Sequence, residues 1–183
     1  MEYPLELSSN ILGLEASIID ASGRVIFRSD GFTIFAGTQR TQPLHRVKIE
    51  RWMSLSPRFR LFDLNGKAVC TVKRDNIISL WKSWYDVLVD EALVMRICEG
   101  KALGKTLGGL FEGTSLNKVS SRVWNPAFVV SRPDDTVTVL LERRRSFIQS
   151  RFTIKKQTEL GESEERLVLL SLFGLVFLER TYG

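Results

Sequence analysis

The residues best suited to bind a ligand are a group of bases in the last third of the sequence. An arginine triplet occupies positions 143–145 and is followed by Arg151, Lys155 and Lys156. Because successive residues of a strand point to opposite faces, Arg143 and Arg145 should share one face. If the connection to Arg151 is tight, Arg151 and Lys155 lie beside them. Such a patch can hold phosphate or anionic headgroups, or its charges are solvated and protect a strand edge from pairing.

Two pairs of neighbouring carboxylates are the candidates for acid–base chemistry. They are Asp90 with Glu91, and Asp134 with Asp135. Both pairs fall at predicted turns, where Asp commonly hydrogen-bonds its own backbone. An enzyme that uses these carboxylates in a pocket is therefore kept as an alternative rather than as the first interpretation.

Nucleophilic and metal chemistry has little support in the sequence. His45 is the single histidine and has no nucleophile motif nearby, so a surface or hydrogen-bonding role is expected. Cys70 and Cys98 match no zinc or redox spacing and are predicted to be small buried residues in a reducing compartment. We expect no metal site and no cofactor.

Tryptophans provide a possible contact surface. Trp81 and Trp84 lie in one short segment and could form an exposed interface or a membrane-contacting tip, or they could pack over one end of the fold. Binding of nucleic acid through stacked aromatic residues has no recognised motif to support it.

The elements that must position these residues are mostly strands. Apolar and polar residues alternate with period two through much of the chain. Turn residues interrupt this alternation at 20–23, 63–66, 90–91 and 132–135. Many short strands joined by such turns indicate a sandwich or a barrel.

The apolar segment 167–178 decides between those two architectures. Acidic residues precede it, which favours a helix over about 163–180. The apolar part covers about 18 Å as a helix, against about 30 Å of membrane hydrocarbon. A helix that is apolar on all sides belongs inside a protein. We therefore predict a mainly β, antiparallel, near-closed barrel wrapped around a buried C-terminal helix, with residues 1–183 as a single domain.

Composition adds a weak preference for anionic partners. The chain has 183 residues, a net charge of +5 and a pI of about 9.4. This charge suits phosphoinositides, acidic lipids or nucleic acid, or it is simply a moderately basic surface. The first residues lack the basic flank and apolar run of a signal peptide, so a cytoplasmic location is expected.

Strand hairpins that end in one buried apolar helix resemble the tubby C-terminal-like superfamily, which includes tubby, the phospholipid scramblases and the LURP-one-related proteins. The segments that carry this resemblance to the LURP-one-related and scramblase pattern are residues 20–27, 59–72, 79–87, 128–140 and the helix ending at 177–180. The resemblance covers nearly the whole chain as a pattern of turns and apolar positions, without an invariant motif.

The resemblance implies a binding domain rather than an enzyme. Tubby-type members bind phosphoinositides, and scramblases are associated with calcium and membranes. This chain lacks the proline-rich region, the cysteine-rich stretch and the acidic calcium loop of scramblases, so their activity is not expected. We expect a non-enzymatic binding or scaffold domain, cytoplasmic or peripheral to a membrane, that recognises an anionic phospholipid headgroup or a protein. The alternatives are an enzyme with carboxylates at the barrel mouth and a purely structural protein-interaction module.

Overall fold

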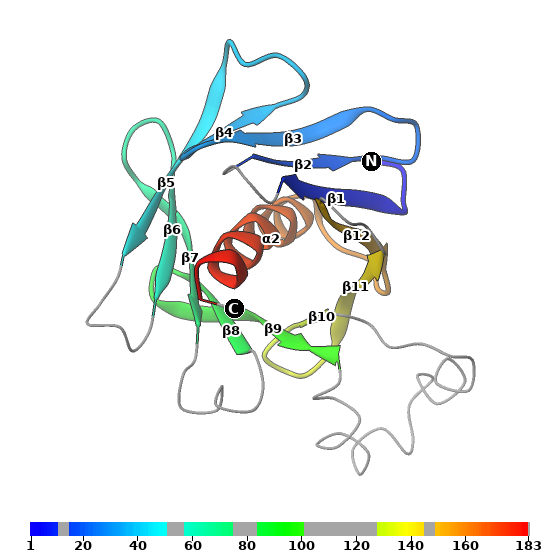
Figure 1. Ribbon diagram of the computed structural model, residues 1–183. Coiled ribbons are helices and arrows are strands. Elements are labelled where there is room, and N and C mark those ends of the chain that lie inside the picture. Colours follow the sequence, from blue (N-terminus) through cyan, green and yellow to red (C-terminus); the bar gives the residue numbers. More distant parts are fainter. Residues whose placement is uncertain (11–14, 51–56, 75–83, 101–127, 145–148, 183) are drawn as a thin grey trace.

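The computed structural model is a closed antiparallel β-barrel with a helix inside it (Figure 1). The structure describes residues 1–10, 15–50, 57–74, 84–100, 128–144 and 149–182. The strands of the barrel are β1 (Leu5–Asn10), β2 (Ala16–Ile19), β3 (Val25–Asp30), β4 (Thr33–Ala36), β5 (Pro43–Glu50), β6 (Arg58–Phe62), β7 (Ala68–Arg74), β8 (Trp84–Val89), β9 (Ala92–Glu99), β10 (Phe128–Ser131), β11 (Val137–Arg144) and β12 (Gln149–Lys156). The helix is α2 (Glu162–Tyr182).

Each strand pairs with its neighbours in the sequence, and β1 pairs with β12 to close the ring. In the closing ladder Leu5 lies opposite Ile154 and Leu7 lies opposite Phe152. Closure leaves no unpaired strand edge, which removes the main route to edge-to-edge aggregation. The predicted antiparallel barrel is confirmed, and it is fully closed rather than nearly closed.

The hairpin turns follow from local chemistry. The Asp20 carboxylate accepts backbone hydrogen bonds from Ser22 and Arg24, which stabilises the β2–β3 turn. Asp90 and Glu91, between β8 and β9, both have positive φ, at 49° and 61°. Positive φ at both central residues is typical of the two-residue type I′ turn, whose twist matches that of the strands. The predicted turns at these positions are confirmed.

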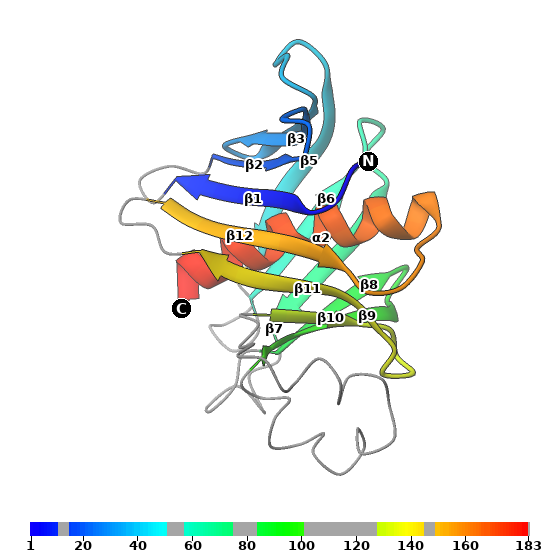
Figure 2. The same cartoon turned by 90° about the vertical axis from the view of Figure 1, so that its right-hand side faces the viewer.

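Helix α2 fills the interior of the barrel. Figure 2 shows it running behind β12 and β11, and its residues from Val168 to Leu178 are buried. The rings of Phe177 and Phe59 (β6) stack at 5.7 Å between centroids. At Gly174 the helix approaches the wall so closely that a Cβ atom would lie 2.7 Å from Val72 Cγ2. The predicted central helix is confirmed, and it extends slightly beyond 163–180 at both ends.

Polar contacts hold both ends of α2. Near its start, Arg132 donates from Nε to Glu164 Oε1 at 2.6 Å and from Nη2 to Oε2 at 2.9 Å. Near its end, the hydroxyl of the fully buried Tyr85 donates to Glu179. Within the described part of the chain, no helix combines the length and the apolar character needed to cross a membrane.

Candidate anion-binding face

The bases of the predicted patch do not all lie on one face of the barrel wall. Arg144 on β11 lies opposite Arg151 on β12, and both point outward. Arg143 lies opposite the buried Phe152, so it belongs to the inward side of the wall, where it is exposed at the strand's end. The expectation that Arg143 lies beside Arg151 and Lys155 is therefore wrong. Arg145 lies outside the described residues.

Acidic residues offset the outward bases of β11 and β12. Arg144 and Arg151 lie 3.8 and 3.9 Å from the two carboxylate oxygens of Glu6 on β1. Lys155 donates to Glu142 at 3.0 Å. Three bases thus face two acids, which leaves little excess charge for an anionic ligand.

Lys156 lies apart from these bases. It is opposite Val139, which points into the barrel. Its ammonium lies 3.2 Å from Glu159 and 5.8 Å from the centre of the Tyr3 ring. Lys156 therefore helps to close the barrel end where α2 begins.

A denser group of bases lies on the outward side of β5, β6 and β7. We call it the basic face, and it consists of Arg46, Lys48, Arg58, Arg60 and Lys73 with the acid Glu50. These positions alternate with the inward, buried Val47, Phe59, Leu61 and Val72. Within this group five bases face one acid, and Glu91 of the β8–β9 turn adds a second carboxylate 3.6 Å from Arg60 Nη2.

Like charges lie directly opposite each other on this face. Lys48 on β5 is paired in register with Arg60 on β6. Arg58 on β6 is paired in register with Lys73 on β7. Cross-strand pairs of like charge destabilise a sheet, whereas opposite charges stabilise it by about 0.2–1 kcal/mol. Opposite charges offset part of this cost, because Glu50 lies opposite Arg58 and Asp86 lies opposite Lys73. Each like-charged pair still places two bases side by side, where an anion can bridge them.

The two like-charged pairs differ in how far nearby carboxylates neutralise their positive charge. Glu50 Oε1 lies 3.2 Å from Lys48 Nζ, and Glu50 Oε2 lies 3.3 Å from Arg60 Nε. Among the described residues, neither Arg58 nor Lys73 makes an ion pair, and Arg58 Nε is buried without a hydrogen-bond partner. The Arg58–Lys73 pair is thus the part of the basic face with the most unsatisfied donor capacity.

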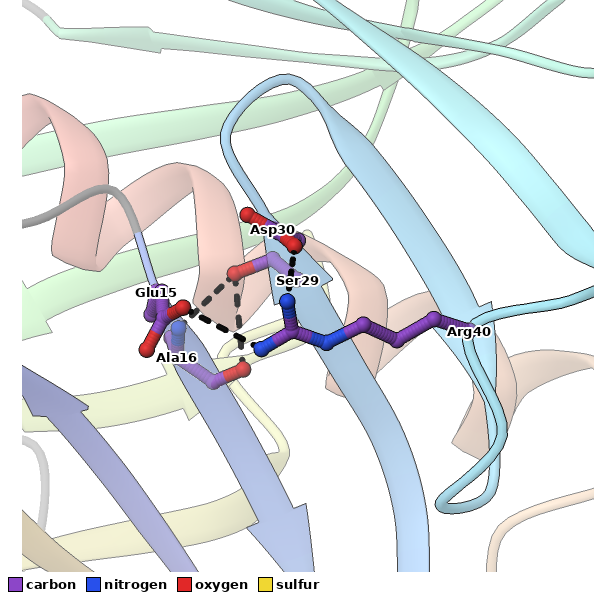
Figure 3. A network of polar contacts seen from close by, with 5 residues as sticks. All are labelled: Glu15, Ala16, Ser29, Asp30 and Arg40. Atoms are coloured by element: carbon purple, nitrogen blue, oxygen red, sulfur yellow. Dashed lines mark hydrogen bonds and ion pairs between the residues drawn. The ribbon is translucent and has the colours of Figure 1, made fainter.

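Arg40, in the connection between β4 and β5, is a base that forms ion pairs with two acids of the protein (Figure 3). It lies 2.5 Å from Asp30 and 3.2 Å from Glu15. Beside it the Ser29 hydroxyl accepts a hydrogen bond from the backbone of Ala16 at 2.9 Å and so joins β2 to β3. Arg40 lies in the β4–β5 connection and not on β5, β6 or β7, so it is not part of the basic face.

The candidate carboxylates lie in two exposed turns. Asp90 and Glu91 connect β8 to β9, and Asp134 and Asp135 connect β10 to β11. The backbone N–H of Thr136 donates to Asp134 and lowers the pKa of that carboxyl. A lowered pKa keeps Asp134 ionised, which is opposite to what a general acid needs. In the described ranges no group of three metal-binding side chains forms.

His45 and Cys70 are both buried in the barrel. His45 Nε2 lies 3.4 Å from Arg166 Nη2 of α2, and burial, together with that positive charge, lowers the pKa of His45. Of the two roles expected for His45, the surface position is wrong, because the residue is buried, and the hydrogen-bonding role agrees with its contact with Arg166. Burial raises the pKa of Cys70 to about 12, so its thiol is protonated and inert at neutral pH.

Trp84 packs on a second, smaller apolar cluster, formed by Cys98, Val129, Val137 and Leu140. These residues come from β9, β10 and β11, and Val129 lies opposite both Cys98 and Leu140. Trp84 is therefore half-buried on packed neighbours. Trp81, the other half of the predicted contact surface, lies outside the described residues.

Comparisons with known proteins add little. No protein-family model matches the chain, and no curated protein matches it. An X-ray structure of a protein from Arabidopsis thaliana is similar over 97% of this chain and 92% of that chain, with 14% identity and a TM-score of 0.35. At that level the likeness supports no conclusion about function.

Sequence reasoning missed the basic face, although a signal for it was present. Arg46 and Lys48 are two residues apart, as are Arg58 and Arg60. In a strand this spacing places both members of a pair on one face. The missing information was the register, which brings Lys48 beside Arg60 and Arg58 beside Lys73.

Proposed function

We propose that the protein is a non-enzymatic, cytoplasmic binding domain of the tubby-like type whose basic face holds phosphate-bearing lipid headgroups at a membrane surface. The observation that carries this proposal is the pair Arg58 and Lys73, which lie in register on the outward side of the barrel and make no ion pair with any other residue that the structure describes. Arginine and lysine are the side chains that bind phosphate most strongly, and their charges are worth about 1 kcal/mol each near an anionic membrane.

The shape of the site favours a surface ligand over an enclosed substrate. The bases lie on the outside of a sheet, and α2 occupies the inside of the barrel. A membrane presents many headgroups in one plane, and an outward strand face can meet such a plane with several bases at once. The resemblance of the sequence pattern to the tubby-like superfamily supports the same class of ligand.

A vesicle-sedimentation experiment tests this function. The protein is mixed with phosphatidylcholine vesicles, with or without phosphoinositide, and its recovery in the pellet is measured. We expect recovery only with phosphoinositide, and we expect it to fall as salt is added, because exposed charges are screened. Equal recovery with both kinds of vesicle would exclude this function.

Two double variants with the same change in charge locate the binding surface. Arg58→Gln with Lys73→Gln removes two charges from the basic face and should weaken vesicle binding roughly 30-fold, at about 1 kcal/mol per charge. Arg144→Gln with Arg151→Gln removes two charges near Glu6 on another part of the barrel and should leave most of the binding intact. If both double variants lose binding equally, then net charge, and not the basic face, is responsible.

A further inference from the structure

The basic face has two positions at which an anion can bridge bases. One position lies between Lys48 and Arg60, and the other lies between Arg58 and Lys73. Adjacent strands are about 4.8 Å apart, and residues two apart on one strand are separated by about 6.7 Å. The centres of the two positions are therefore about 8 Å apart at the level of the backbone. The long side chains of lysine and arginine can converge from these two positions on two phosphate groups of one ligand.

One of these positions is already occupied by a carboxylate of the protein. Glu50 spans the Lys48–Arg60 position, with one oxygen near each base, at 3.2 and 3.3 Å. Glu91 Oε1 also lies 3.6 Å from Arg60 Nη2, another nitrogen of that guanidinium. Glu50 also lies opposite Arg58 in the ladder, yet its ion pairs are with Lys48 and Arg60. No carboxylate of the described residues forms an ion pair at the Arg58–Lys73 position. Asp86, which lies opposite Lys73 on β8, is 3.6 Å from Arg96 instead.

We infer that Glu50 is an internal competitor that selects against doubly phosphorylated headgroups: a first phosphate binds between Arg58 and Lys73, and a second binds only by displacing Glu50 from Lys48 and Arg60. The inference rests on the proposed function and adds a specificity-determining residue to it. A headgroup with one ring phosphate uses the open position and leaves Glu50 in place. A headgroup with two ring phosphates also contacts Lys48 and Arg60, but only after the ion pairs of Glu50 with these bases are broken.

The competition between Glu50 and a phosphate group should change the dissociation constant by a measurable factor. Partly exposed ion pairs contribute about 0.2–1 kcal/mol each, and Glu50 makes two of them with its side chain 29% exposed. Removing the carboxylate should therefore strengthen binding of the doubly phosphorylated headgroup by roughly 2- to 30-fold more than it strengthens binding of the singly phosphorylated one. The ratio of the two gains is the relevant quantity, because loss of any acid makes the protein more basic and raises its affinity for every anionic vesicle.

Glu50→Gln is the variant that tests the inference. Its dissociation constants are measured for phosphatidylcholine vesicles containing equal mole fractions of either singly or doubly phosphorylated phosphatidylinositol. Glu142→Gln is the matched control, because Glu142 is also an outward strand carboxylate, 27% exposed, and pairs with Lys155 at 3.0 Å. We expect Glu50→Gln to favour the doubly phosphorylated lipid, and we expect Glu142→Gln to leave the preference unchanged.

Lys48→Gln provides a second measurement that does not depend on Glu50→Gln folding normally. With Glu50 present, Lys48→Gln should weaken binding of the doubly phosphorylated lipid less than Arg58→Gln does, because Glu50 already occupies Lys48. In a Glu50→Gln background the loss caused by Lys48→Gln should grow, as a double-mutant cycle would reveal.

The outcomes separate the two ideas. If wild-type protein binds phosphoinositide vesicles and Glu50→Gln strengthens binding of both lipids by the same factor, Glu50 only adds to the electric field and the competitor role is wrong. If Lys48→Gln costs as much as Arg58→Gln in the wild-type background, both positions are open and the competitor role is also wrong. If the wild-type protein does not bind phosphoinositide vesicles at all, the proposed function itself fails.

Discussion

Replacement of Gly174 by alanine is the sharpest test of how α2 sits in the barrel. A Cβ atom at this position would lie 2.7 Å from Val72 Cγ2, 2.8 Å from Phe59 Cδ1 and 3.0 Å from Val72 Cβ. Phe59 and Val72 are fully buried, and both belong to the barrel wall. The added methyl group therefore meets side chains that have no free space to move into.

Two opposing effects decide the size of the change. Alanine is a better helix former than glycine by about 1 kcal/mol. Overpacking of a close-packed core costs about 1–3 kcal/mol, and contacts this short against a ring and a β-branched side chain belong at the upper end. We therefore expect Gly174→Ala to reduce the free energy of unfolding by about 1–2 kcal/mol. For a chain of this length, the melting temperature should fall by roughly 2–8 °C.

Thermal and urea unfolding followed by circular dichroism measure this effect. Val72→Ala is the companion variant, because it removes the γ-methyl group that the new Cβ would touch. The double variant should be at least about 1 kcal/mol more stable than the sum of the single effects predicts. A Gly174→Ala protein that melts at the wild-type temperature or above it would refute the close packing of α2 on β6 and β7, because the gain in helix propensity would then be unopposed.

Two further predictions concern polar groups inside the barrel. The pKa of His45 is lowered by burial and by the neighbouring Arg166, with Asp63 acting in the opposite direction. The folded state therefore binds fewer protons at His45 than the unfolded state. The free energy of unfolding should be largest above about pH 6.5 and should decline as the pH falls below that value. His45→Gln should reduce this pH dependence in melting curves taken between about pH 7 and pH 5. Tyr85→Phe removes the hydroxyl that donates to Glu179 and should cost about 1–2 kcal/mol in urea unfolding, and an unchanged midpoint would show that this contact does not hold the end of α2.

The interior of the barrel was predictable because its signals are local. Alternation with period two marks the inward residues of a strand, and an apolar stretch without a polar face marks a helix that must be enclosed. Irregularities limit even this reasoning. Period two would place Val137 on the inward side with Val139. The register shifts between Val130 and Ser131, however, and Val137 joins the smaller apolar cluster beside Leu140.

The candidate site was harder to predict because it depends on how separate strands align. Leu141 points inward, so Arg143, two residues later, shares its side, while Arg144 points outward. That step uses the sequence alone. The pairing of Arg144 with Arg151, and of Arg58 with Lys73, is set by turn lengths and by bulges, which a single sequence does not specify.

The position of α2 restricts where a ligand can bind. In many β-barrels the interior is available for a small ligand, but here its space is filled by the buried side chains of the helix, such as Phe173 and Phe177. A ligand could enter only by displacing a helix whose burial contributes to the core of the fold. Evolutionary change on the inward side is therefore constrained by packing, whereas the outward side can vary in charge at small cost to stability. Two like-charged pairs lie in register on that outward side, and opposite-charge pairs with Glu50 and Asp86 offset only part of their repulsion. The proposed anionic surface would offset the remainder by bridging the bases.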